Sequence, residues 1–105
     1  MTFEHTTSIS EILEHSHREP VIIFKYSNDC GTSDDLVSKL ENAVAKKSII
    51  SPIYKITVQD QPTLSKNIAE HFEIKHETPQ IIILNKAKVT YTAHHRGIKV
   101  ADFAF

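Results

Sequence analysis

The chain has 105 residues, with 12 Lys and Arg against 13 Asp and Glu, so its formal charge is -1. A chain of this length suits one domain with its own core, and we expect a single domain over residues 1–105. The balanced charge lacks the basic surface that a phosphate backbone requires, which argues against nucleic acid as a partner. Only two glycines occur, too few for a dinucleotide fingerprint or a P-loop, so both kinds of nucleotide site are excluded.

Cys30 is the only cysteine, so the chain can form neither an internal disulfide nor a multi-cysteine zinc site. The longest apolar runs are Val21–Phe24 and Ile81–Leu84, far short of the roughly 18 residues that span a bilayer. The first 15 residues lack the basic and apolar regions of a secretory signal. We therefore expect a cytoplasmic protein, in a compartment that keeps thiols reduced, with no membrane partner.

Hydrophobic periodicity and the four prolines divide the chain into helices and strands. Two β-branched runs that are apolar on both faces predict central strands, and two alternating runs predict edge strands. A capping-box spacing between Ser8 and Glu11 and a proline at position 62 mark two helix starts. The expected elements are, in chain order, a helix over 8–17, a strand over 21–24, a helix from about 30–33, a strand over 53–58, a helix from Pro62, a strand over 81–84, a strand over 88–93 and a short helix over 98–105.

The apolar pattern of each strand predicts the order of the strands in the sheet. With the two central strands inside and the two alternating strands at the edges, the four strands take the order 2-1-3-4. The helix between the first two strands requires a parallel, right-handed crossover, and the short turn at 85–86 requires an antiparallel last pair. This layout is an α/β, thioredoxin-like fold with a four-stranded mixed sheet flanked by helices and an N-terminal helix.

Cys30 lies between a buried strand and an amphipathic helix, so we expect its sulfur near a helix N-terminus. The unpaired N–H groups and the positive end of the helix dipole favour the thiolate, which is the reactive form. The nearby carboxylates of Asp29, Asp34 and Asp35 oppose it. We expect the helix to outweigh them and to hold the thiol pKa below its ordinary value of about 8.5. The alternative is a buried, unreactive cysteine, which the polar neighbours argue against.

Ser33 stands where a dithiol oxidoreductase keeps its resolving cysteine, which makes the motif Cys-x-x-Ser. A serine cannot form the disulfide, but its hydroxyl can donate a hydrogen bond to a thiolate; it could equally cap the helix. A single thiol can take a small thiol from a mixed disulfide, and a second, external thiol must then release it.

Pro79 opens an apolar strand, where the missing N–H of proline is tolerated. Most X-Pro bonds are trans, but thioredoxin folds carry a cis-proline at this place, beside the active cysteine. We therefore expect the Thr78–Pro79 bond to be cis.

Seven histidines raise the question of a metal site. Their spacing argues against one, because His15 and His17 diverge on a helix and His94 and His95 should face opposite sides of a strand. We expect no metal, with His76 and His94 on the rim near Pro79.

Three segments resemble the monothiol bacilliredoxin family, thioredoxin-like proteins that act on mixed disulfides of bacillithiol. They are FKYSNDCGTS over 24–33, HFEIKHETPQ over 71–80 and KVTYTAHH over 88–95. The resemblance covers nearly the whole chain and implies that Cys30 is the nucleophile and Pro79 the cis-proline of a thiol-binding groove. The family commonly has proline after the cysteine, where this chain has Gly31, so the loop is more flexible.

The rim of this groove should carry cations that attract the carboxylates of a small thiol. We expect the segments around Pro79 and after the last strand to flank the groove on the side away from Asp34 and Asp35. Arg96 can bind a carboxylate through two parallel hydrogen bonds, although these cations could equally be solvated surface charges. The expected substrate-binding residues are Gly31, Thr32, Lys75, His76, Thr78, Pro79, His94 and Arg96, with Cys30 and Ser33 as the catalytic residues.

The leading interpretation is an enzyme that removes a small thiol from S-thiolated proteins. Bacillithiol or glutathione would be its co-substrate, with no permanently bound cofactor, and the protein would be a monomer or a weak dimer. Cys-Gly-x-Ser is also similar to the monothiol glutaredoxins, which hold an iron–sulfur cluster between two protomers. Thr32 stands where those proteins usually have Phe, and no Gly-Gly motif precedes the last helix. The third alternative is a non-catalytic thioredoxin-like stress protein with an unreactive Cys30.

Overall fold

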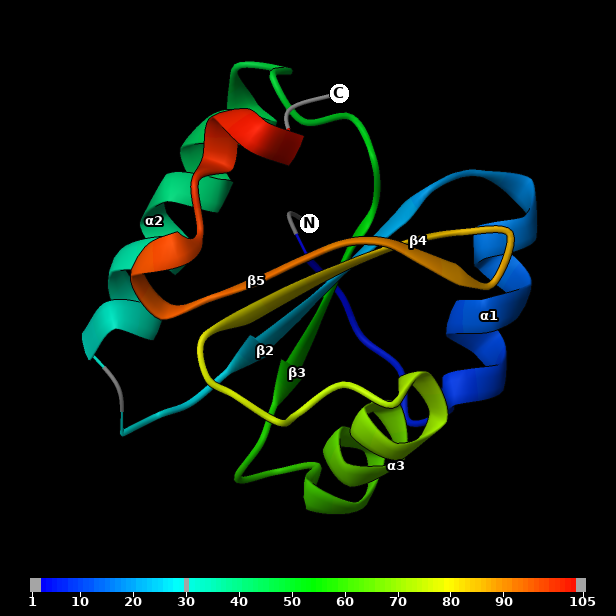
Figure 1. Ribbon diagram of the computed structural model, residues 1–105. Coiled ribbons are helices and arrows are strands. Elements are labelled where there is room, and N and C mark those ends of the chain that lie inside the picture. The colour runs from blue at the N-terminus through cyan, green and yellow to red at the C-terminus, as the bar shows by residue number, and fades with distance from the viewer. Residues whose placement is uncertain (1–2, 30, 104–105) are drawn as a thin grey trace.

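The computed structural model describes residues 3–29 and 31–103, with the backbone alone for residues 96, 102 and 103. Helices and strands alternate along most of the chain, which ends in two 3-10 turns (Figure 1). No helix in the described part is long and apolar enough to cross a membrane. The elements are β1 (Phe3–Glu4), α1 (Ile9–Arg18), β2 (Val21–Tyr26), α2 (Gly31–Ala45), β3 (Ile53–Thr57), α3 (Pro62–Phe72), β4 (Gln80–Asn85), β5 (Lys88–His94), η1 (His95–Gly97) and η2 (Val100–Phe103).

The strands form one mixed sheet in the order β1-β3-β2-β4-β5. Strand β3 pairs in parallel with both β1 and β2, and β4 pairs antiparallel with β2 and β5. The predicted parallel first pair and antiparallel last pair are therefore confirmed. Helices cover both sides of the sheet, so the apolar residues Val21–Phe24 of β2 are buried on both faces.

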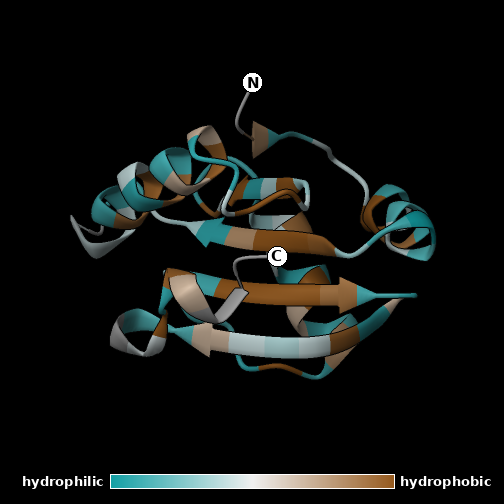
Figure 2. Ribbon diagram, turned by 90° about the horizontal axis from the view of Figure 1, so that it is seen from above, coloured by the Kyte–Doolittle hydropathy of each residue, from teal (hydrophilic) through white to brown (hydrophobic). Residues whose placement is uncertain are grey.

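Two apolar cores lie on the two faces of the sheet. Figure 1 shows α2 and the C-terminal turns on one side, with α1 and α3 on the other. In Figure 2 the hydrophobic strands lie in the middle of the molecule between these layers. The core on the α2 side contains Ile22, Phe24, Leu36, Leu40, Ala43, Ile49, Ile53, Ile81 and Ile83. The core on the other side contains Ile12, Val21, Ile23, Tyr54, Ile56, Leu64, Ile68, Ile82 and Leu84.

The prediction of a four-stranded sheet was wrong in strand number and in order. Phe3 and Glu4 pair with Ile53 and Tyr54, so a fifth strand covers β3 and makes β3 an inner strand. Two residues are too few to show a hydrophobic period, which is why the sequence did not reveal this strand. The other predicted neighbours are as expected, with β2 between β3 and β4 and with β5 at the outer edge.

Two details at the chain reversals also differ from the prediction. Within the described residues, the segment of the expected helix over 98–105 forms only the short 3-10 turn η2, which another such turn, η1, precedes. The hairpin turn is at Lys86 and Ala87, whose φ angles are 52° and 63°, and not at 85–86. Asn85 instead stays in the ladder and pairs with Lys88.

The start of α1 uses a different cap from the predicted Ser8–Glu11 capping box. Ser8 makes no side-chain capping bond. The hydroxyl of Thr6 accepts the Ser8 amide at 3.1 Å and donates to Glu11 Oε2 at 2.9 Å. Thr6 therefore takes the place that the spacing assigned to Ser8.

Candidate active site at the start of helix α2

Cys30, the expected nucleophile, lies outside the described residues, between the end of β2 and the start of α2. One hydrogen bond joins the residues on either side of it, and another links two of the residues before it. The Ser27 amide donates to Ser33 Oγ at 3.4 Å, and the Asp29 amide donates to Ser27 Oγ at 3.3 Å. The loop that contains the cysteine is therefore closed at its base.

Ser33 is the third residue of α2 and is fully buried. Its hydroxyl oxygen accepts the amide of Ser27, six residues earlier. This contact orders the loop rather than the first turn of the helix. Donation from Ser33 to a Cys30 thiolate stays a prediction.

Gln59 is a residue of this site that the sequence did not reveal. It follows β3, and its side chain contacts all three residues that precede Cys30. Its Oε1 accepts the Asn28 amide at 3.0 Å, and its Nε2 donates to Ser27 Oγ at 2.8 Å and to Asp29 Oδ2 at 3.5 Å. An exposed glutamine at a strand end carries no spacing signal, so only the fold could place it here.

The hydroxyl of Tyr26 donates a short hydrogen bond to Asp34 Oδ1 in the first turn of α2. This bond to the carboxylate, followed by burial, raises the pKa of Tyr26. The ammonium of Lys55 lies 4.2 Å from the centre of the Tyr26 ring, a cation–π contact. Asp34, one of the three aspartates expected to oppose a Cys30 thiolate, is therefore hydrogen-bonded to the neutral hydroxyl of Tyr26.

A groove of about 230 Å³ lies between α2 and the chain that enters β4. Thr32 and Pro79, both predicted substrate-binding residues, line it, and the Thr78–Pro79 bond is cis. Thr78 itself is half-buried and Pro79 is buried. The other lining residues are Asp35, Leu36, Lys39, His95 and Ile98.

Three expectations about this groove were wrong, those for Asp35, His94 and His76. Asp35 lines it, whereas we expected the rim to lie away from the aspartates. His95, and not His94, faces the groove, because its φ of 50° ends β5 and its amide donates to the Pro79 carbonyl at 3.0 Å. The same turn brings the His94 and His95 rings to 5.3 Å, although strand alternation predicted that they would face opposite sides. His94 is exposed at the end of β5.

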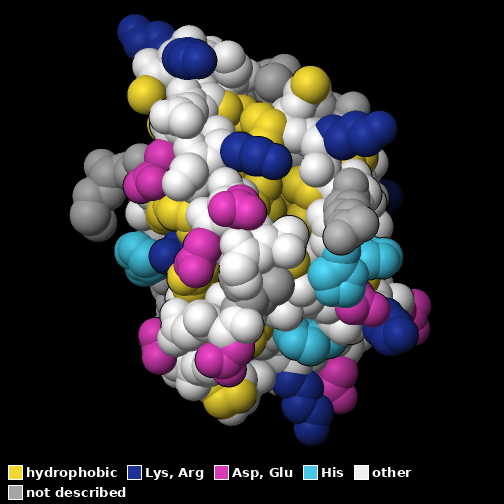
Figure 3. All heavy atoms as spheres, turned by 90° about the vertical axis from the view of Figure 1, so that its left-hand side faces the viewer, with side chains coloured by type: hydrophobic (Ala, Val, Ile, Leu, Met, Phe, Trp, Pro, Cys, Tyr) yellow, Lys and Arg dark blue, Asp and Glu magenta, His cyan; other side chains and the backbone are white. Residues whose placement is uncertain are grey.

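The rim is less cationic than the sequence suggested, because Glu77 lies among its cations. Its carboxylate is 3.5 Å from Lys75 Nζ and 3.7 Å from His95 Nε2. Figure 3 shows this side of the molecule, where histidines, lysines and carboxylates are intermixed. Arg96 is in η1, and its side chain lies outside the described residues.

His76 faces the α3 layer instead of the groove. It meets Lys25 of β2, whose side chain is fully buried. The ammonium donates to the Ser65 carbonyl of α3 at 2.9 Å and lies 3.2 Å from His76 Nδ1. Burial lowers the pKa of Lys25 from 10.5 to about 8. Burial, and then the charge of Lys25, lowers the pKa of His76, while Glu77 acts in the opposite direction.

Gly31 opens α2 with an ordinary backbone, since neither glycine has a positive φ. A Cβ at this position would meet nothing within 4 Å, so the described structure has room for a larger residue there. Among the described residues no three His, Cys, Asp or Glu side chains are grouped to hold a metal ion.

Comparison with known proteins places these features in a family. The family model of Monothiol bacilliredoxin BrxC matches residues 1–103. A solved thioredoxin-fold protein, provisionally assigned as an oxidoreductase, is 22% identical with a TM-score of 0.83, over 98% of this chain and 91% of its own. Oxidised thioredoxin from Plasmodium falciparum is 18% identical with a TM-score of 0.69, over 94% of this chain and 89% of its own. A mutant thioredoxin from Halobacterium salinarum is 12% identical with a TM-score of 0.72, over 95% of this chain and 85% of its own. The structural likeness establishes the thioredoxin fold, and the family match over nearly the whole length establishes that this chain belongs to the monothiol bacilliredoxin family of thiol oxidoreductases.

Proposed function

We propose that the protein removes a small thiol from protein mixed disulfides through Cys30. The Cys30 thiolate attacks the sulfur of the small thiol, the mixed disulfide breaks, and the protein substrate leaves as its thiolate. Cys30 is then joined to the small thiol. The thiolate of a second small thiol attacks this new disulfide, releases Cys30 as a thiolate and leaves as the oxidised small-thiol disulfide. Each step exchanges one S–S bond for another, so no further oxidant is needed.

The observation that carries this proposal is the position of the only cysteine. Cys30 comes directly before α2, in a loop that Ser27, Ser33 and Gln59 close with hydrogen bonds. The groove lined by Thr32 and Pro79 begins in the first turn of the same helix. A substrate strand or small thiol could lie in this groove beside the cysteine.

Bacillithiol is the small thiol that the family membership favours over glutathione. Both present carboxylates around the sulfur, and the groove offers Lys39 and His95 to receive them. Lys75 forms an ion pair with Glu77. We therefore propose that Arg96 contributes more than Lys75 to a preference for bacillithiol over glutathione. Arg96→Ala should then narrow the rate difference between the two thiols, and Lys75→Ala should change it little.

Intact-mass measurement after incubation with an S-thiolated protein tests the reaction. The wild-type chain should gain one small-thiol adduct and release the reduced substrate. Cys30→Ser should form no adduct, and its dethiolation rate should equal that of the small thiol in buffer alone. Residual dethiolation by Cys30→Ser above that background would refute the assignment of Cys30 as nucleophile.

A further inference from the structure

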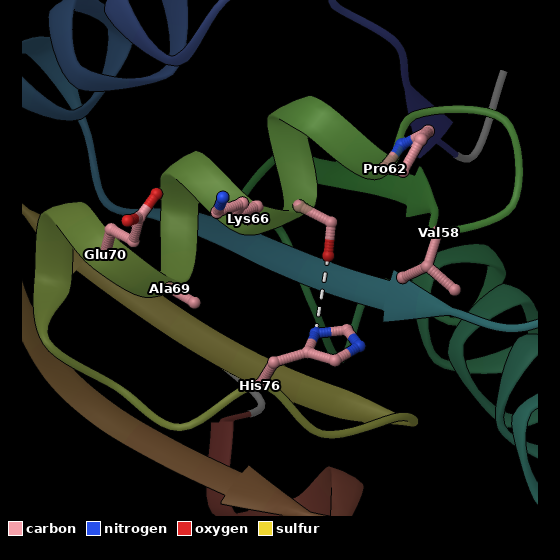
Figure 4. A pocket seen from close by; sticks show the side chains of 7 residues that line it. Val58, Pro62, Lys66, Ala69, Glu70 and His76 are labelled. Atoms are coloured by element: carbon pink, nitrogen blue, oxygen red, sulfur yellow. Dashed lines mark hydrogen bonds between the residues drawn. The ribbon is translucent and has the colours of Figure 1, made fainter.

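A second cavity, of about 410 Å³, lies on the other side of the sheet between α3 and His76 (Figure 4). This volume is in the range of small-molecule sites. Its wall is mainly apolar, with a few polar groups. The lining residues are Val58, Pro62, Ser65, Lys66, Ala69, Glu70 and His76.

The imidazole of His76 supplies a hydrogen-bond donor to this cavity. Its Nδ1 lies 3.2 Å from Lys25 Nζ and 3.4 Å from Ser65 Oγ. An ammonium group has donors only, so Nδ1 must accept and the ring proton of neutral His76 is on Nε2. In Figure 4 this nitrogen turns away from Ser65 towards the side of Val58. Within the described part of the chain Nε2 has no hydrogen-bond partner.

The ammonium of Lys25 lies behind this ring with only neutral acceptors. Among the described residues no carboxylate is within 4.0 Å of its nitrogen. A buried charge without a counter-ion costs free energy. The other charged groups around the cavity are Lys66 and Glu70, which carry opposite charges and are four residues apart on α3, and Glu77, which follows His76 in the chain.

We propose that this cavity binds a small organic carboxylate. Its oxygen accepts a hydrogen bond from His76 Nε2, and its apolar part lies against Val58, Pro62 and Ala69. The carboxylate would supply the negative charge that the Lys25 ammonium lacks. This site is separate from thiol exchange and involves no covalent step.

Benzoate is a suitable probe, and benzamide, of the same shape without the charge, is its control. Binding is measured by NMR titration in the Cys30→Ser chain, which cannot exchange thiols, and follows the His76 ring signals together with the backbone amides of Val58 and Ala69, which also line the cavity. A negative result would therefore leave the proposed reaction of Cys30 untouched. We expect benzoate to shift the His76 signals and to bind about tenfold more tightly than benzamide, the effect of one charge-assisted hydrogen bond.

Two variants locate the source of this preference. Lys25→Met removes the buried charge. His76→Phe removes the Nε2 donor from an exposed side chain, together with the Nδ1 acceptor of Lys25. His76→Phe should bind benzoate and benzamide equally, and Lys25→Met should prefer benzoate less strongly than the Cys30→Ser chain does. Lys88→Met, which removes an exposed charge on β5, should keep the full preference. Equal binding of the two probes by the Cys30→Ser chain, or a preference that survives His76→Phe, would overturn the proposal.

Discussion

Lys25 is a charged residue in the middle of an apolar sheet. The four residues before it on β2 are buried aliphatic and aromatic side chains, and its own side chain has no exposed surface. It lies on the same face as Val21 and Ile23, because side chains two residues apart point the same way. That alternation takes the ammonium away from the α2 side of the sheet and under α3, where it meets the Ser65 carbonyl.

Replacing Lys25 with Met should change how stability depends on pH. The folded protein loses the Lys25 proton at about pH 8, and the unfolded chain loses it near 10.5. Between these values the unfolded state binds more protons, so the stability of the native protein rises with pH. Lys25→Met should abolish that rise. At neutral pH it should be more stable by up to roughly 3 kcal/mol, the free energy of this pKa shift.

Urea unfolding between pH 7 and pH 11 measures the effect, as the difference between variant and wild type. Tyr26 and Tyr54, whose pKa values are raised, titrate in both proteins and cancel in this difference. The control is Lys88→Met, which removes an exposed charge and should follow the wild-type curve. A parallel pair of curves for Lys25→Met and wild type would contradict a lowered pKa at Lys25.

Gln59 should matter for rate more than its exposed position suggests. Gln59→Ala removes the bonds to Ser27, Asn28 and Asp29, which order the three residues before Cys30. We expect a loss of about 1 kcal/mol in stability and roughly tenfold slower thiol exchange. Stopped-flow dethiolation and urea unfolding measure the two effects.

Gln61→Ala is the matched control for Gln59→Ala. Gln61 donates from its side chain to the Thr6 carbonyl at 2.6 Å, away from the Cys30 loop. It should lower stability by a similar amount, about 1 kcal/mol, without slowing thiol exchange. Equal slowing by both variants would mean that Gln59 acts through general stability alone.

At the scale of the elements, the first turn of α1 offers a test of which residue caps it. Thr6→Val should destabilise the protein by about 1 kcal/mol, because it removes the acceptor for the Ser8 amide and the partner of Glu11. Ser8→Ala should have little effect, since the Ser8 hydroxyl makes no capping bond. Thermal unfolding of the two variants decides between the two caps. A larger loss of stability for Ser8→Ala than for Thr6→Val would mean that Ser8 caps the helix after all.

The elements that the sequence predicted well are those whose pattern is long. The runs at 21–24 and 81–84 are apolar on both faces and became β2 and β4, and Pro62 begins α3. The elements that the sequence did not predict are short ones. β1 has two residues, and the described C-terminal segment forms 3-10 turns of three and four residues.

Across the whole molecule, the sequence predicted the candidate site from its local motifs but did not reveal its tertiary partners. Cys-x-x-Ser and Thr78–Pro79 are contiguous in the sequence, so they could be recognised there. Gln59 and Glu77 enter the site from other elements. His95 enters because one left-handed residue ends β5. Such contacts depend on how segments meet in space, and no periodicity within one segment encodes them.

Ser16 connects two parts of the fold that are 71 positions apart. Its carbonyl accepts the Lys86 amide and its hydroxyl accepts the Ala87 amide, both at 2.8 Å. The hydroxyl also donates to the Leu13 carbonyl at 2.6 Å within α1. The amides of the β4–β5 turn are therefore protected from solvent only while α1 is docked. In hydrogen exchange, the Lys86 and Ala87 amides report the undocking of a helix near the other end of the chain, and not the fraying of their own hairpin.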